Sequence, residues 1–216
     1  YLPAAYAEDR TSGANPIQQS LDNLRNAGLV YGGIIYDKSP VVMEMLVRVL
    51  GEEAFREGIR EYIKSFPYGN ATWDELIEIL DRYTEADLRS WSQAWVGEKG
   101  MPELTATIEG DELVVRQQDA WGRGLIWPQQ LAYQLYSHGK TQLVTLNSDA
   151  AEVRGKLEHL PTDARILPNV DGRGYGFFRL DEQTAATCWE VLRTRTDEVL
   201  RGSLLITLFE NLRRQA

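Results

Sequence analysis

The hydrophobic periodicity of the chain changes sharply at Met101–Pro102, and this change constrains the fold more than any other feature of the sequence. Before it, from Pro40 to Trp95, apolar residues recur every three or four positions, as amphipathic helices require. After it, from Leu104 to Leu180, apolar residues alternate with polar ones in short runs separated by turns, as strands require. From Asp181 onward the helical spacing returns. The sequence therefore predicts helices, then strands, then helices.

At least six short strands are expected between Leu104 and Leu180, with tight turns at Gly110–Asp111 and Gly139–Lys140. Short strands joined by tight turns favour an antiparallel β-sandwich. The predicted fold class is α+β and multidomain. Its three parts are an α-helical piece at residues 1–102, the β-sandwich at residues 103–180 and the first helices of a further α-helical domain at residues 181–216.

Composition excludes several classes of partner. The 216 residues carry a net charge of -9 and the isoelectric point is near 4.9, so we expect no nucleic-acid partner, since binding phosphates needs a basic surface. No run of about eighteen apolar residues is present, so no membrane segment is expected in this chain. The single cysteine, Cys188, cannot form an intrachain disulfide, and its helical pattern favours a small buried hydrophobe over a nucleophile.

Both ends of the sequence favour a fragment of a longer protein. The chain starts at Tyr1 rather than at a methionine, and it stops at Ala216 while the pattern is still helical. We expect the last apolar stripe, Leu200–Leu212, to lack a packing partner within this chain. The compartment stays unknown, with cytoplasmic, periplasmic and extracytoplasmic locations all open.

Metal-binding patterns are missing from this sequence. There is no H-E-x-x-H motif, and the two histidines, His138 and His159, have no second His or Cys at ligand spacing. The sequence predicts no metal ligands and no cofactor-binding residues here. The nucleophile motif G-x-S-x-G and the phosphate-binding loop G-x-x-x-x-G-K-[ST] are absent as well.

One short stretch combines an aromatic ring with charges just before a helix. In "GGIIYDKSPVVMEML", Tyr36 is followed by Asp37 and Lys38, and Pro40 then suits the first turn of a helix. From the residues alone two interpretations stay open. Tyr36 is either a half-buried ring with its hydroxyl paired, which is the common case, or a phenol presented to a reacting group.

The wider text around this stretch resembles the aminopeptidase N family of zinc metallopeptidases, the gluzincins. The resemblance rests on "IIYDKSPVVMEMLVRVLGEEAFREGIREYI", "YGNATWDELIEIL" and "DLRSWSQAWVGEKGMPEL", in this order and spacing. It extends to "NVDGRGYGFFRL", which supplies Asn169, Gly174, Tyr175 and Arg179, and to "LRGSLLITLFENL". It covers nearly the whole chain and is most specific from Tyr36 to Pro102.

The resemblance implies a role for Tyr36. In this family the tyrosine of a Tyr-Glu-Lys-Gly-like motif donates its hydroxyl to the oxyanion that forms from the scissile carbonyl, beside a zinc ion. A phenol, with a pKa of about 10, stays protonated at neutral pH and can donate. Tyr31 lacks the following lysine and fits the motif less well. Ser39 replaces the glycine of the motif, and with Pro40 it still suits a helix start.

The resemblance also implies that the zinc ligands and the general-base glutamate lie upstream of Tyr1, outside this chain. The predicted function is therefore that of a fragment of a zinc-dependent aminopeptidase, inactive when isolated, whose parent hydrolyses N-terminal residues from peptides. The expected partners are a peptide substrate and the upstream catalytic half of the same protein. Two alternatives stay open: a non-catalytic gluzincin-like scaffold and a β-sandwich binding module.

Overall fold

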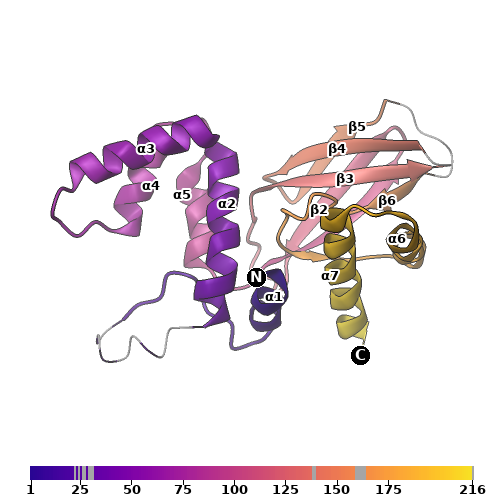
Figure 1. The fold of residues 1–216 in the computed structure, drawn as a ribbon, viewed down its shortest axis with the longest axis horizontal. Coiled ribbons are helices and arrows are strands. Elements are labelled where there is room, and N and C mark those ends of the chain that lie inside the picture. Colours follow the sequence, from indigo (N-terminus) through magenta and orange to yellow (C-terminus); the bar gives the residue numbers. More distant parts are fainter. Residues whose placement is uncertain are drawn as a thin grey trace. The chain divides into compact units, whose positions relative to one another are not determined.

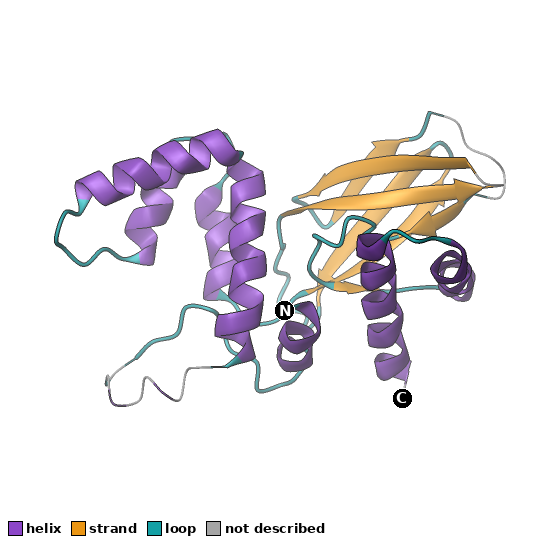
Figure 2. Cartoon of the chain, in the orientation of Figure 1, coloured by secondary structure: helices purple, strands orange, loops and turns teal. Residues whose placement is uncertain are grey.

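The structure, a computed structural model, describes residues 1–216 except 22, 24, 26, 27, 29–31, 138, 139, 159–163 and 216. The chain divides into two compact units, Tyr1–Gly100 and Met101–Ala216. The first unit is helical and the second combines strands with helices, as Figure 2 shows. The described residues thus have the predicted α+β fold class, in the predicted order of helices, strands and helices.

The first unit is built from short helices (Figure 1). They are α1 (Leu2–Asp9), the π-helix η2 (Ile34–Lys38), α2 (Ser39–Leu50), α3 (Glu52–Ser65), α4 (Trp73–Asp81), α5 (Leu88–Ser92) and the π-helix η3 (Gln93–Gly97). Their boundaries follow local signals. Thr72 and Glu75 form the capping box that "TWDE" predicts: the Thr72 side chain accepts from Glu75 N, and the Glu75 side chain accepts from Thr72 N. Gly51 ends α2 at a φ of 82°, a value that glycine adopts without strain.

The second unit contains two sheets and two helices. The elements are β1 (Pro102–Glu109), β2 (Glu112–Asp119), β3 (Gln129–Ser137), β4 (Lys140–Ser148), β5 (Glu152–Lys156), β6 (Arg165–Leu167), β7 (Phe177–Phe178), α6 (Glu182–Thr194) and α7 (Glu198–Gln215). One sheet has the strand order β5-β2-β1-β7 and the other has the order β4-β3-β6. The predicted turn at Gly110–Asp111 is confirmed, because Glu109 pairs directly with Glu112. Gly139, in the second predicted turn, lies outside the described residues.

The two sheets enclose a shared apolar core, which makes this region a β-sandwich. Residues from both sheets contribute buried side chains, among them Leu104, Val115, Leu131, Tyr133 and Phe178. The strand pairs are antiparallel with one difference from the expectation: β7 pairs with β1 in parallel. The chain returns to the edge of the sheet by a long route after β6, so the direction of β7 is not constrained by a tight hairpin.

The last two helices pack within the second unit, which corrects the expectation for the Leu200–Leu212 stripe. Leu204 and Leu208 are buried in a cluster with Leu167 of β6 and with Cys188 of α6, and Leu200 packs against the same cluster. Leu212 alone of the stripe is exposed, at 58%. Periodicity showed that this helix has an apolar face, but it could not show that α6 and β6 already cover it. A separate helical domain beginning at residue 181 stays a prediction.

The family-like segment from Asn169 to Arg179 closes the sandwich through buried polar contacts. Asn169 is 3% exposed and has a φ of 49°; its Oδ1 accepts from Gly174 N at 2.8 Å and its Nδ2 donates to Gly174 O at 3.1 Å. Its own carbonyl accepts from Ser203 Oγ of α7 at 2.5 Å. Tyr175 is fully buried, and Arg179 pairs with Glu103 of β1. A single asparagine thus shapes the loop and connects it to α7.

Replacing Asn169 by alanine should lower the free energy of unfolding. Two buried hydrogen bonds to Gly174 are lost, at about 1 kcal/mol each, and alanine at a positive φ adds roughly 1 kcal/mol of strain. Asn169→Gly is the matched control, because it loses the same amide but accepts the positive φ. Urea denaturation should rank wild type above Asn169→Gly and Asn169→Gly above Asn169→Ala; equal stability of the two variants would contradict the role of φ.

The outer face of the β5-β2-β1 sheet carries a network of ion pairs. Arg116 contacts Glu109 at 2.8 Å and Glu152 at 2.7 Å, while Arg154 contacts Glu152 at 2.7 Å, Glu112 at 3.1 Å and Glu109 at 3.2 Å. The hydrogen bond from Arg116 lowers the pKa of Glu109, and the hydrogen bond from Arg154 lowers the pKa of Glu152. Two arginines therefore connect carboxylates of three neighbouring strands.

This network should stabilise the second unit at neutral pH and lose its effect in acid. Because the pKa values of Glu109 and Glu152 lie below the unfolded value of about 4.3, the stabilisation is present above that value and disappears as the pH falls through the folded pKa. The stability difference between wild type and Arg154→Gln, measured by urea denaturation, should therefore shrink from pH 7 to pH 3. It should also shrink in 1 M salt. A difference independent of pH and salt would show that Arg154 acts through packing alone.

Candidate functional site

Tyr36 lies at the centre of the π-helix η2, which runs into α2 without interruption. The wider turn is closed by a hydrogen bond from Ser39 N to the carbonyl of Ile34, five residues earlier. The Tyr36 side chain is 58% exposed, whereas Ile34 and Lys38 on the same π-helix are buried. Single π-turns inside helices are rare and occur frequently at functional sites. The structure thus presents the tyrosine that the sequence selected on a regular, hydrogen-bonded element.

Two glycines allow η2 to approach α1 closely. A Cβ atom on Gly33 would lie 2.6 Å from Oε2 of Glu8, and one on Gly32 would lie 3.2 Å from Oε1 of the same residue. The first distance is shorter than a Cβ atom tolerates, so a side chain at position 33 would have to displace the flexible carboxylate of Glu8.

Lys38 is buried at the end of η2 and forms an ion pair there. Its Nζ lies 2.8 Å from Oδ2 of Asp9, the last residue of α1, and both side chains are 0% exposed. Lys38 Nζ also donates to the carbonyl of Gly100 at 2.7 Å, and Gly100 N donates to Oδ1 of Asp9 at 3.1 Å. We call these three residues the Asp9–Lys38–Gly100 cluster.

Sequence reasoning selected Tyr36 but missed the Asp9–Lys38–Gly100 cluster. Lys38 was noted only as a neighbour of Tyr36, and Asp9 was not singled out among 32 acidic residues. The sequence did contain a signal for a buried lysine, because Lys38 lies between the apolar residues of "GGII" and an apolar helix. A lysine that is buried at such a position needs a carboxylate partner. The identity of that partner, 29 positions away, could not be read from local spacing.

Four other residues were considered as functional candidates from the sequence: Tyr31, His138, His159 and Cys188. Tyr31, His138 and His159 lie outside the described part of the chain. Cys188 is 0% exposed, and burial raises the pKa of its thiol to about 12. A thiol that stays protonated at neutral pH is a poor nucleophile, so the interpretation of Cys188 as a buried hydrophobe is confirmed.

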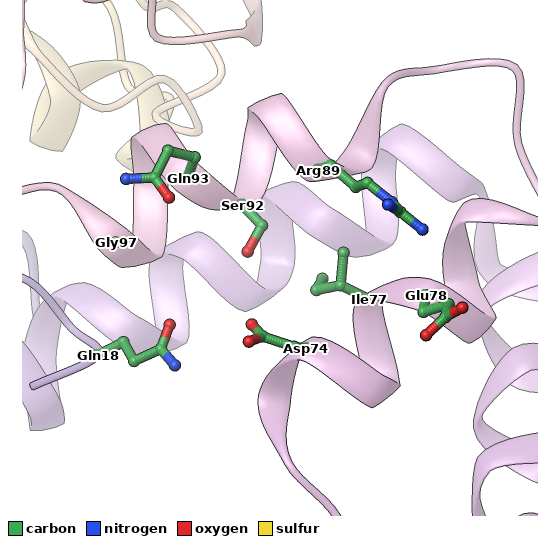
Figure 3. Close-up of a pocket in the computed structure, with 8 residues that line it drawn as sticks. All are labelled: Gln18, Asp74, Ile77, Glu78, Arg89, Ser92, Gln93 and Gly97. Atoms are coloured by element: carbon green, nitrogen blue, oxygen red, sulfur yellow. The ribbon is translucent and has the colours of Figure 1, made fainter. Parts of the chain in front are cut away.

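A polar cavity of about 270 Å³ lies between α4 and the α5–η3 segment, as Figure 3 shows. Its walls include the carboxylates of Asp74 and Glu78, the amides of Gln18 and Gln93, and Arg89. These five side chains are exposed, so water can satisfy their hydrogen bonds. Tyr36 is not among the lining residues, and the groups present do not select one class of ligand.

No group of three or more His, Cys, Asp or Glu side chains among the described residues is arranged to hold a metal ion. The described part of the chain therefore does not fit a zinc ion. Nor does any helix within the described ranges have the length and apolar character to cross a bilayer.

The 216-residue chain, purified without a tag, should bind no stoichiometric zinc. Its sequence has no H-E-x-x-H motif and no pair of His or Cys residues at ligand spacing. Elemental analysis after dialysis, with a zinc-finger peptide as the positive control, provides the measurement. One equivalent of zinc retained per chain would contradict this prediction and would reveal ligands that sequence spacing does not show.

Comparison with known proteins gives matches over most of this chain. Residues 2–95 match the model of the peptidase family M1 domain. Aminopeptidase N of Streptomyces lividans is 30% identical over 217 residues, which cover 92% of this chain and 25% of that protein. Aminopeptidase M1-C of Oryza sativa subsp. japonica is 21% identical over 87% of this chain and 22% of its own length. Aminopeptidase N of Lactobacillus helveticus is 29% identical over 50% of this chain and 13% of its own length.

The family match and the similarity over most of the chain support the aminopeptidase N family of M1 peptidases. It spans about a quarter or less of the length of these relatives. The match to the M1 domain ends at residue 95, close to the division between the two compact units at Gly100.

Proposed function

We propose that this chain is part of a zinc-dependent aminopeptidase that hydrolyses N-terminal residues from peptides, and that Tyr36 is its oxyanion-stabilising residue. The observation that carries the proposal is the exposed phenol on η2, inside the segment that matches the M1 domain. The zinc ligands belong to a part of the protein outside this chain. Its partners are a peptide substrate and that other catalytic half. The domain division at residues 1–102, 103–180 and 181–216 is part of the same proposal.

The placement of Tyr36 suits a hydrogen-bond donor for a developing negative charge. When a peptide carbonyl is attacked, its oxygen gains charge, and a fixed donor lowers the barrier because it needs no reorganisation at that moment. A phenol donates one hydrogen bond and stays neutral. Because Tyr36 is on a helical element, the position of its backbone is defined before substrate binds.

Replacing Tyr36 by phenylalanine in the full-length protein should lower kcat and leave KM nearly unchanged. Only a hydroxyl is lost, and it acts mainly when charge develops on the carbonyl oxygen. Removing one oxyanion donor typically costs roughly 10²–10³ in kcat, or about 3–4 kcal/mol. Zinc content and melting temperature should not change, since Tyr36 is not a ligand in this proposal and the ring is retained. Steady-state kinetics with an aminoacyl anilide measures the effect.

Two matched variants separate Tyr36 from other tyrosines. Tyr68→Phe removes a hydroxyl from a fully exposed ring in the loop after α3 and should be silent. Tyr31→Phe changes the residue that fits the motif less well and should also be nearly silent. Loss of kcat in Tyr31→Phe with full activity in Tyr36→Phe would assign the role to Tyr31. Full activity in both would remove the oxyanion role from this segment, and absence of peptidase activity in the wild type would favour a scaffold.

A further inference from the structure

The Asp9–Lys38–Gly100 cluster connects three parts of the first unit that are far apart in the sequence. Asp9 ends α1, Lys38 ends η2, and Gly100 follows η3. Each member is bonded to both of the others: Lys38 to Asp9 and Gly100 through Nζ, and Gly100 to Asp9 through its own N–H. The cluster therefore holds η2 at a defined place between two other segments, and η2 carries Tyr36.

A buried ion pair is an unusual way to hold a helix. Taking both charges out of water is costly, and well-packed apolar side chains of similar size often stabilise a fold equally well. An ion pair with additional hydrogen bonds restricts the orientation of the lysine side chain. Nζ of Lys38 must point at two acceptors at once, the carboxylate of Asp9 and the carbonyl of Gly100. These two directional contacts oppose a shift of η2 along its axis and a rotation about it.

The position of Tyr36 on η2 makes it sensitive to such a shift. Ile34 and Lys38 are the buried residues of this five-residue π-helix, and Tyr36 lies between them on the exposed side. Fixing the buried face therefore fixes the backbone of Tyr36 and the direction of its Cα–Cβ bond, from which the phenol extends. A displacement of the reacting groups by about 1 Å can reduce catalysis by as much as 10².

We infer that Asp9 is a positioning residue for Tyr36: through its buried ion pair with Lys38, it holds the π-helix in the place from which the phenol reaches the substrate. The inference rests on the proposed function of Tyr36. Asp9 touches no substrate in this account, and its effect on catalysis passes through Lys38 and η2. Oxyanion stabilisation at Tyr36 therefore requires a carboxylate 27 residues earlier in the chain.

The test is a double-mutant cycle in the full-length protein with Asp9→Asn and Tyr36→Phe. Asn keeps the shape of the side chain but removes the charge that holds Lys38. Asp9→Asn alone should lower kcat by roughly 10–10² with little change in KM, as misplacement of a catalytic group does. In the Tyr36→Phe background the same change should alter kcat by less than about twofold, because a residue that acts through Tyr36 has nothing left to position.

Controls separate positioning from a general loss of stability. Leu80→Ala removes a fully buried core side chain of α4 and should destabilise the first unit while leaving kcat unchanged at temperatures where the protein is folded. If Asp9→Asn does not fold, Asp9→Glu replaces it in the cycle, because it keeps the charge. Its carboxylate is displaced by one methylene, so Asp9→Glu should still lower kcat. The effect should again disappear in the Tyr36→Phe background.

Hydrogen exchange provides a readout that does not depend on activity. In the 216-residue chain, Asp9→Asn should speed exchange of the amides of residues 34–39 relative to α4, and Leu80→Ala should do the reverse. If the exchange of η2 is unchanged, or if the kcat effects of Asp9→Asn and Tyr36→Phe multiply, the inference is overturned. If η2 exchange rises as expected but Tyr36→Phe keeps full kcat, the proposed function fails while the anchoring of η2 by Asp9 stands.

Discussion

The first unit depends on a charge that has no access to water. The ammonium of Lys38 is 0% exposed, and it is tolerable there because Asp9 supplies a carboxylate at 2.8 Å and Gly100 supplies a carbonyl at 2.7 Å. A buried charge without such partners would be neutralised or excluded from the core. The end of α1, the end of η2 and the segment that follows η3 must therefore meet at one point, and the π-helix is oriented as a consequence.

This cluster reverses the usual distribution of side chains. In most proteins lysine is exposed and a large aromatic ring is covered. On η2 the lysine is buried and the tyrosine two positions earlier is 58% exposed. The reversal follows from the face that each residue occupies on a short helix, since Ile34 and Lys38 share the buried side. Tyr36 therefore combines two properties: its buried neighbours Ile34 and Lys38 hold the helix in place, and its own side chain stays exposed.

Much of the fold was accessible from local sequence. The capping box of Thr72 and Glu75 lies within four residues, and the two-residue turn at Gly110–Asp111 lies within one hairpin, so spacing alone predicts both. The helical and strand periods likewise gave the α+β class. The parallel pairing of β7 with β1 and the burial of Leu204 and Leu208 were missed. Both depend on which distant segment arrives beside them, and periodicity carries no information about partners.

The candidate site divides in the same way. The sequence by itself determined that Tyr36 lies just before an apolar helix and that a lysine lies two positions later. The structure corrects the start of that helix, because Tyr36 is already inside the helical element η2. Only the tertiary structure decided that Lys38 faces the interior, that Asp9 is its partner, and that the backbone of Gly100 completes the cluster. The reason is physical: local spacing sets which residues share a helix face, whereas the pairing of buried charges is decided by the packing of segments 29 and 62 positions away.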